Sequence, residues 1–238
     1  MRQLFALLIL AAGNFLLPLN ALAQWQVDGI ALSTAANEQH FPAIVTDGAG
    51  GAIVTWYDYR NGNADIYAQR VNASGVPQWT SGGVALCTAA NSQEVPTIVS
   101  DGAGGAIVTW SDFRSGLDYD IYAQRVNASG VPQWAPADGV ALSIVANDQS
   151  LSTIVSDGDG GAIVTWHDFR SLVDYDIYAQ RVNASGVPQW AANGVALSTA
   201  ANDQIFPTIV SDGAGGAIVT WYDYRSGSAD IYAQRVNA

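Results

Sequence analysis

A motif centred on one tryptophan recurs four times along this chain of 238 residues, and it constrains the fold more than any other feature. The first copy begins at Asp47 and reads D-G-A-G-G-A-I-V-T-W-Y-D-Y-R, followed shortly by D-I-Y-A-Q-R-V-N-A. The four tryptophans are spaced by 54, 56 and 55 residues, at Trp56, Trp110, Trp166 and Trp221. A repeat of this length is too small to bury its apolar face alone, so the copies are expected to stack on one another.

Each repeat holds four short segments with the composition of β-strands. In the first copy they cover residues 41–47, 51–59, 65–72 and 76–88, which are rich in Val, Ile, Thr, Tyr and Trp. The linkers D-G-A-G-G and N-A-S-G are typical of hairpin turns, and no segment shows a helical apolar period. The second segment is apolar on both alternating faces, so its sheet must lie between two others. We therefore predict an all-β propeller of four-stranded antiparallel blades.

The two ends of the chain complement each other in sequence. Residues 24–34, Q-W-Q-V-D-G-I-A-L-S-T, match the fourth segment of the first repeat, Q-W-T-S-G-G-V-A-L-C-T. The last repeat has three segments and stops at Asn237 and Ala238. We predict four blades closed into a ring, with one blade shared between the N- and C-terminal strands and repeats at about residues 24–78, 79–133, 134–189 and 190–238. The alternative is a fragment of a larger propeller or array.

The repeat resembles a known family of β-propeller blades. P-T-I-V-S-D-G from Pro96, A-I-V-T-W-S-D-F-R from Ala106 and D-I-Y from Asp120 are similar to the TolB-type, WD40-like repeat. They are closer still to the tandem W-x-D-x-R and D-I-Y-A-Q-R repeats of secreted bacterial surface proteins. S-D-G-A-G-G-A-I-V-T-W also has a looser likeness to the Asp-box of sialidase propellers. The family's Pro before Asp-Gly is absent here, and this repeat is longer than a TolB blade.

The N-terminus and the charge indicate an exported protein with an uncharged partner. Residues 1–23 have a positive start, an apolar run and a small-x-small end, which is typical of a secretory signal peptide. Secretion, or a periplasmic or cell-surface location, is therefore expected, without a membrane span after cleavage. The chain has 21 acidic and 9 basic residues, which disfavours nucleic acid. An extracellular glycan or protein is the expected partner, and the oligomeric state is left open.

Differences between the copies concentrate in two kinds of loop: the turn from the second to the third segment and the link to the next blade. If the first segment lies innermost, both lie on one face, and variable loops of repeat proteins commonly form the binding face. The candidate ligand-binding residues on this face are His40, Tyr57, Tyr59, Tyr119, His167, Tyr175, Tyr222 and Tyr224.

A recurring set of aspartates and arginines is interpreted as a structural latch rather than a site. Its members are Asp58, Arg60 and Asp65; Asp112, Arg114 and Asp120; Asp168, Arg170 and Asp176; and Asp223, Arg225 and Asp230. We expect Arg to pair with Asp across neighbouring strands and to satisfy buried polar groups. A carboxylate- or sulfate-binding ring of arginines is the alternative.

Evidence for catalysis in the sequence is weak. Glu38, Glu94, His40 and His167 occur in single copies and are interpreted as solvated loop residues, and no known catalytic motif is present. Asp157 and Asp159 offer two carboxylates on a Gly-rich turn, a possible calcium site, and no other cofactor is expected. The sequence therefore favours an exported non-catalytic binding module for a glycan or protein. The alternatives are a sialidase-like or other glycan-active hydrolase, and a structural repeat segment of a longer cell-surface protein.

Overall fold

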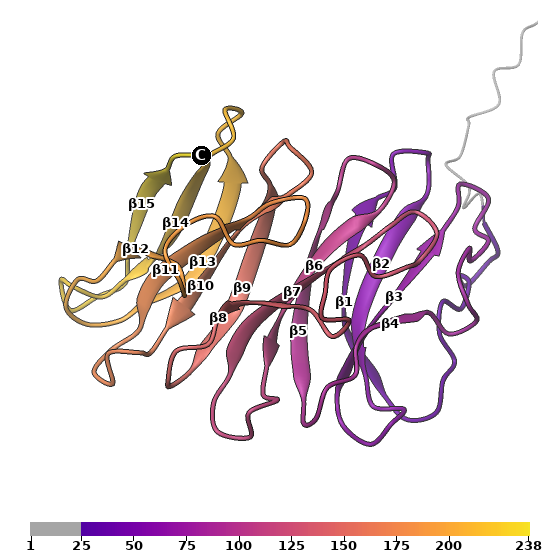
Figure 1. Ribbon diagram of the computed structural model, residues 1–238, viewed down its shortest axis with the longest axis horizontal. Helices are drawn as coiled ribbons and strands as arrows, with labels where there is room; N and C mark the ends of the chain where they lie inside the picture. Colours follow the sequence, from indigo (N-terminus) through magenta and orange to yellow (C-terminus); the bar gives the residue numbers. More distant parts are fainter. Residues whose placement is uncertain (1–24) are drawn as a thin grey trace, which may run out of the picture.

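The computed structural model describes residues 25–238, and the predicted signal peptide at residues 1–23 lies outside them. The described part contains fifteen β-strands and no helix, and therefore no helix that could cross a membrane. Four antiparallel sheets follow one another along the chain (Figure 1). This confirms the prediction of an all-β protein built from four-stranded blades.

The strands of each sheet are hydrogen-bonded in chain order. The first sheet contains β1 (Gln39–Thr46), β2 (Ala52–Asp58), β3 (Asp65–Val71) and β4 (Val84–Cys87). The second contains β5 (Gln93–Ser100), β6 (Ala106–Asp112), β7 (Asp120–Val126) and β8 (Val140–Ser143). The third contains β9 (Gln149–Ser156), β10 (Ala162–Asp168), β11 (Asp176–Val182) and β12 (Val195–Ser198). The last contains β13 (Gln204–Ser211), β14 (Ala217–Asp223) and β15 (Asp230–Val236).

The hairpin between the first two strands of a blade depends on its aspartate and its last glycine. The Asp47 carboxylate accepts hydrogen bonds from the backbone N–H groups of Ala49 and Gly51, both at 2.8 Å. A Cβ on Gly51 would lie 2.1 Å from the carbonyl oxygen of Val71, so only glycine fits. The repeated D-G-A-G-G sequence is thus required by the turn itself.

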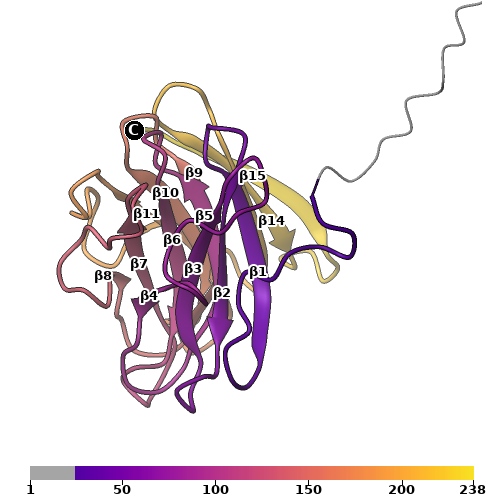
Figure 2. The same ribbon diagram turned by 90° about the vertical axis from the view of Figure 1, so that its right-hand side faces the viewer.

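Neighbouring blades are joined by tryptophans that reach from one repeat to the next. The Trp79 indole N–H donates to the carbonyl oxygen of Ala128 at 3.1 Å, and its ring covers Gly130. Leu86 of the first blade is buried against Trp110 of the second. Trp134 makes the same bond to Ala184 between the second and third blades, and the leucine–tryptophan packing recurs at all three joints. The sheets therefore stack in a regular row, which Figure 2 shows from its first-blade end.

The first strand of each blade lies on the inner side of the stack. β1 contacts β5, β5 contacts β9, and β9 contacts β13. The links before these strands and the second-to-third turns lie at the end of the sheets opposite to the C-terminus in Figure 1. The variable loops therefore share one face, as the internal comparison of the repeats predicted.

The predicted closure of the ring is wrong for this structure. Residues 25–34 do not pair with β15: the Trp25 indole donates to Ala73 at 2.9 Å, and Leu32 packs against Val54 and Trp56. These contacts keep the segment on the first blade, at the opposite end of the row from β15 (Figure 1). The physical reason is that blade contacts are local, so each sets only the position of its neighbour. The stack fits an arc of a propeller.

Candidate functional site

The residue after each blade tryptophan differs between the repeats in a way that decides where a cavity opens. The four residues at this position are Tyr57, Ser111, His167 and Tyr222. Three carry rings that occupy the space above the inner strands: Tyr57 stacks on Phe41 with ring centroids 5.5 Å apart and an interplanar angle of 20°. Ser111 is the small exception. A cavity can therefore form beside the second blade without disturbing the repeat architecture.

A pocket of about 280 Å³ opens beside Ser111, between the second and third blades. Its walls come from β5, β6, β9 and the loops that adjoin them. The lining residues are Glu94, Val95, Ser111, Tyr119, Asp148, Ser150 and Leu151. Two carboxylates, three hydroxyls and two aliphatic side chains are the kind of lining that binds a small polar ligand.

Tyr119 connects the two carboxylates of the pocket. Its backbone N–H donates to Oδ1 of Asp148 at 3.0 Å, and its hydroxyl donates to Oε2 of Glu94 at 3.3 Å. Burial and the nearby charge of Glu94 raise the pKa of Tyr119, so its phenol keeps its proton at neutral pH. The backbone hydrogen bond fixes the position of the Asp148 carboxyl group beside Tyr119.

The Ser111 hydroxyl is a buried polar group of the pocket wall that lacks a protein partner in the described part of the chain. Ser111 is 3% exposed, and its Oγ has no hydrogen-bond partner among residues 25–238. An unpaired buried hydroxyl costs about 1 to 3 kcal/mol unless water or a ligand pairs with it. Since Ser111 also lines the pocket, a ligand hydroxyl there would supply the partner.

The corresponding space between the third and fourth blades is filled. Burial lowers the pKa of His167 to about 4, so the imidazole is neutral at pH 7, and its Nε2 lies 2.7 Å from the Ser150 hydroxyl. The ring packs on Tyr175 with a centroid distance of 4.7 Å and on Phe206 at 6.1 Å. His167 is therefore a packed wall residue next to the pocket.

The other predicted ligand-binding residues fall into separate groups. His40 lies 2.9 Å from Glu38, and its ring approaches Tyr57 and Tyr59 on the first blade. Tyr222 lies near Phe206 on the last blade, and the backbone N–H of Tyr224 donates to Asp203. Of the predicted set only Tyr119 lines the pocket. Glu94 and Ser150 were not predicted as site residues, and neither were Asp148 and Ser111.

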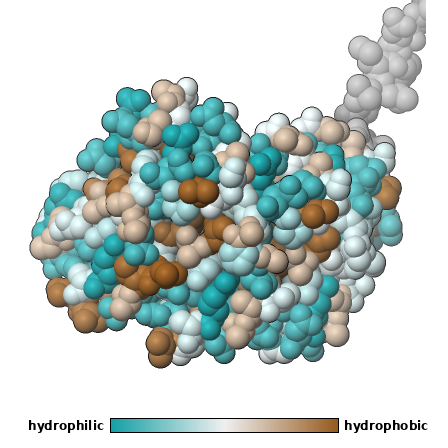
Figure 3. Space-filling model, viewed as in Figure 1, coloured by the Kyte–Doolittle hydropathy of each residue, from teal (hydrophilic) through white to brown (hydrophobic). Residues whose placement is uncertain are grey.

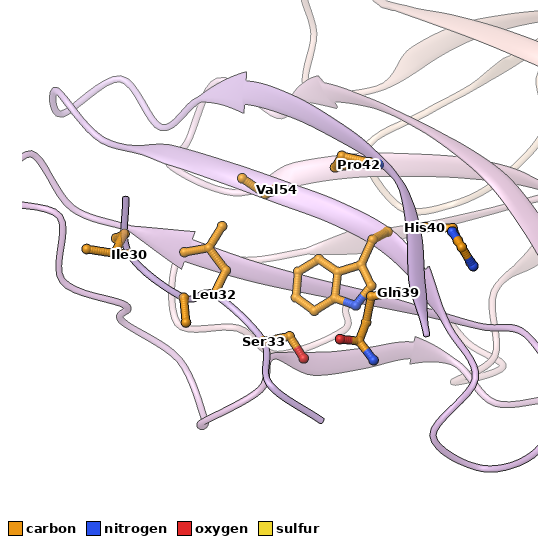
Figure 4. Close-up of a pocket in the computed structure, with 9 residues that line it drawn as sticks. Ile30, Leu32, Ser33, Gln39, His40, Pro42 and Val54 are labelled. Carbon is orange, nitrogen blue, oxygen red and sulfur yellow. The ribbon is translucent and has the colours of Figure 1, made fainter. Parts of the chain in front are cut away.

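A second cavity, of about 330 Å³, lies where residues 30–33 rest on the first blade (Figure 4). Ile30, Leu32 and Val54 form its apolar part, and Ser33 and Gln39 lie at its polar end. Its one titratable lining residue is the predicted ligand-binding residue His40, and it contains no carboxylate, so it lacks the pair of carboxyl groups that glycoside hydrolysis requires. We interpret it as the seam between the N-terminal segment and the first sheet.

The aspartates and arginines form a repeated ion pair whose geometry differs from the prediction. Arg60 pairs with Asp58, two residues earlier, at 2.5 Å, and its guanidinium lies 3.7 Å above the centroid of the Tyr67 ring on the next strand. Asp65 lies opposite Asp58 and accepts hydrogen bonds from Asn61 rather than from arginine. The expected cross-strand Arg–Asp pair is therefore replaced by a cation–π contact across the strands.

Every arginine within residues 25–238 is paired with an aspartate. Arg60, Arg114, Arg170 and Arg225 bind the aspartate two residues before them, while Arg70, Arg125, Arg181 and Arg235 bind the aspartate of the D-G hairpin turn. No unpaired cation of this part of the chain is left to attract an anionic ligand.

The proposed calcium residues are occupied by protein groups. Asp157 accepts the backbone N–H groups of Asp159 and Gly161, and its other oxygen lies 3.0 Å from Nε of Arg181. Asp159 lies 3.4 Å from the same guanidinium. A cation would have to displace Arg181, so these carboxylates do not fit calcium. Within the described residues no cluster of three or more acidic, His or Cys side chains is placed to hold a metal.

Asp120 gives the molecule a pH dependence of stability. Burial and the nearby charges of Asp118 and Asp112 raise the pKa of Asp120 to about 7. A raised pKa means that the folded state favours the proton, so the contribution of Asp120 to stability is full below about pH 4 and is lost as the pH rises towards 7. We expect Asp120→Asn to raise the free energy of unfolding by about 2 kcal/mol at pH 8 and by almost nothing at pH 4. Urea unfolding at both pH values measures this, and an equal effect at both would contradict it.

Comparison with known proteins tests the fold and the function that were predicted from the sequence. No family model matches the chain, and no curated protein matches it. A solved protein of unknown function from Dyadobacter fermentans is 10% identical over 81% of this chain and 51% of its own, with a TM-score of 0.56. The α-L-arabinanase of Penicillium chrysogenum, solved with arabinobiose, is 13% identical over 83% and 62%, with a TM-score of 0.53. The endo-arabinase of Bacteroides thetaiotaomicron is 12% identical over 87% and 78%, with a TM-score of 0.45.

At these identities the similarity shows the fold, a β-propeller, and the chain spans about half to three fifths of the first two proteins. The preference for a non-catalytic binding module is wrong in the light of these findings. A glycan-cleaving enzyme shares the fold. In addition, the pocket brings together Glu94, which has no acidic equivalent in the other repeats, and Asp148, whose equivalent in the last blade is Asp203. The chain is similar in fold to propeller enzymes, with its candidate site between the second and third blades.

Proposed function

We propose that this protein is a glycan-active hydrolase whose site is the pocket between the second and third blades. The observation that carries the proposal is the pair Glu94 and Asp148 in one pocket, beside the unpartnered hydroxyl of Ser111. Glycoside hydrolysis requires two carboxyl groups in different environments, one on each side of the bond that breaks. The comparison with the P. chrysogenum α-L-arabinanase supports a glycan as the partner.

The different contacts of the two carboxyl groups suggest their roles. Asp148 is held in place by a backbone N–H, and it takes the proton of the attacking water or attacks the anomeric carbon itself. Glu94 is held only by the Tyr119 hydroxyl and serves as the acid that protonates the leaving oxygen as the C–O bond breaks. Ser111 and Ser150 are placed to bind sugar hydroxyls.

The variant Ser111→Tyr tests the pocket without disturbing the fold. Tyrosine already occupies this repeat position at Tyr57 and Tyr222, so the scaffold accommodates it. We expect the ring to fill the cavity and to lower the release of reducing ends from neutral glycans at least 100-fold, with an unchanged melting temperature. Ser111→Ala keeps the cavity open but removes one hydrogen bond to a sugar hydroxyl, so it should raise KM about 10-fold and leave kcat nearly unchanged.

A panel of neutral arabinans, xylans, glucans and mannans, assayed for reducing ends, is the direct experiment. Binding to one of them without hydrolysis by the wild-type protein, or full activity of Ser111→Tyr, would contradict the proposal. The predicted signal peptide at residues 1–23 supports action outside the cytoplasm. We also propose that the blades are of the TolB-type, WD40-like class.

A further inference from the structure

A row of four equivalent side chains crosses the inner side of the stack, one on each inner strand. They are Phe41 on β1, Val95 on β5, Leu151 on β9 and Phe206 on β13. All four have a positive φ, of 51°, 51°, 51° and 55°, at the point where the register of the strand shifts. This backbone conformation is rare for bulky residues, and a bulge of this kind redirects a side chain. The bulges therefore place one of these four side chains at the same position of the inner strand in every blade.

The pocket occupies the middle of this row. Val95 and Leu151 are part of its wall, and Phe41 and Phe206 lie one blade further out on either side. The inner strands contact one another in the order β1, β5, β9 and β13, so the row is continuous. With face-to-face sheets about 10 Å apart, the row extends roughly 30 Å, which is longer than a single sugar ring requires.

Aromatic surfaces stand at both ends of the row. Phe41 is 60% exposed and stacks on Tyr57, whose ring also meets Tyr59 at 5.8 Å. Phe206 is 53% exposed and lies 6.0 Å from Tyr222, which is itself 46% exposed. Exposed rings of this kind are flat apolar surfaces, suited to the C–H faces of sugars.

The charges along the row select against an acidic polymer. Glu38 beside His40, and Glu94 and Asp148 in the pocket, contribute negative charge, while the arginines of the described chain are tied to aspartates. A polyanion would be repelled and would find no free cation to bind. Figure 3 shows the side of the molecule that faces the viewer in Figure 1, on which apolar groups alternate with polar residues.

We infer that the row binds a neutral polysaccharide chain of several sugar units, with the pocket cleaving a bond in the interior of the chain. Phe41 with Tyr57 forms one platform, and Phe206 with Tyr222 forms the other. The inference rests on the proposed hydrolase function. It adds that the substrate is a polymer gripped on both sides of the bond that breaks, so cleavage is endo-acting.

The test compares Phe41→Ala and Phe206→Ala with the wild type on linear neutral oligosaccharides of two and six units. Each variant should lower kcat/KM on the six-unit substrate about 10-fold and leave the two-unit substrate within 2-fold, because only the longer chain reaches a platform. Val131→Ala, an exposed apolar residue on the opposite face, is the matched control and should change neither.

Early products from the polymer give a second readout. The wild type should cleave long chains faster than short ones and release a mixture of internal fragments. The double variant Phe41→Ala/Phe206→Ala should lose this preference for long chains. Equal losses on both oligosaccharides, no loss on either, or release of single units from the chain end would overturn the inference while leaving hydrolysis established. Absence of any hydrolysis by the wild type would instead overturn the proposed function.

Discussion

The variants Glu94→Gln and Asp148→Asn should each lower kcat on a neutral glycan about 1,000-fold while leaving the fold intact. Positioned acid–base groups contribute about 10² to 10⁴ in rate, and both carboxyl groups lie in one pocket with no other acidic residue lining it. The amides keep the size of the side chains and can still hydrogen-bond with Tyr119. The loss should therefore appear in kcat, with KM changed only slightly.

Asp203→Asn is the matched control for this experiment. Asp203 is the repeat equivalent of Asp148 and accepts the backbone N–H of Tyr175 at 3.1 Å, but it does not line the pocket. Its replacement should leave kcat unchanged. An equal loss of activity from Asp203→Asn and Asp148→Asn would show that this position is structural in every blade and would contradict the assignment.

The variant Asp112→Ala should reduce the free energy of unfolding by about 3 to 5 kcal/mol. Asp112 is fully buried and accepts hydrogen bonds from the Trp110 indole at 2.7 Å and from the Arg114 guanidinium at 2.6 Å. Removing one partner of a buried pair leaves an uncompensated charge and an unpaired indole N–H. The Asp112–Arg114 pair therefore allows the Trp110 indole N–H to be buried between the blades.

Urea unfolding of Asp112→Ala and of the double variant Asp112→Ala/Arg114→Met measures the effect. Removing both charges should recover part of the lost stability, since the remaining apolar groups need no counterion. A loss below about 1 kcal/mol in the single variant would indicate that solvent replaces the aspartate and that the pair is a surface contact.

The blades could be predicted from the repeat, because turn glycines and strand alternation act within about ten residues of their own position. Gly51 fits a turn that no other residue can form, and the alternation around Trp56 required sheets on both sides. Closure of the ring was predicted incorrectly. Sequence similarity identified residues 25–34 as equivalent to a fourth strand, and Trp25 does dock as Trp79 does. The angle that accumulates over four blades is not encoded in any one repeat.

The candidate site was largely missed for a different reason. Differences between the repeats single out large residues such as His40 and Tyr119, whereas the pocket exists because Ser111 is small among aromatic equivalents. Glu94 and Asp148 belong to different blades, and their proximity depends on how the sheets stack. The signal that was available is the exception at the position after the tryptophan, where a serine replaces a ring.

The geometry of the arginines was predictable only in part. Their pairing with aspartate follows from burial, but the choice of Asp58 over Asp65 depends on Tyr67, which stacks under the guanidinium. Asp65 is then left to Asn61. Burial raises the pKa of Asp65, and the hydrogen bond from Asn61 opposes this effect; Asp120 and Asp176 lack the asparagine, and burial raises their pKa values to about 7 and about 6. Small differences at the turn therefore change the titration of each blade.

The most direct test of the proposed site is a crystal structure of Glu94→Gln grown with a neutral oligosaccharide that the wild type cleaves. The variant keeps the pocket but slows the reaction, so the substrate should remain intact. We predict a sugar ring between β5 and β9, with one hydroxyl within hydrogen-bond distance of Ser111 Oγ and the glycosidic oxygen beside residue 94. An oligosaccharide bound elsewhere, such as in the cavity around Leu32, with the pocket beside Ser111 empty, would contradict it.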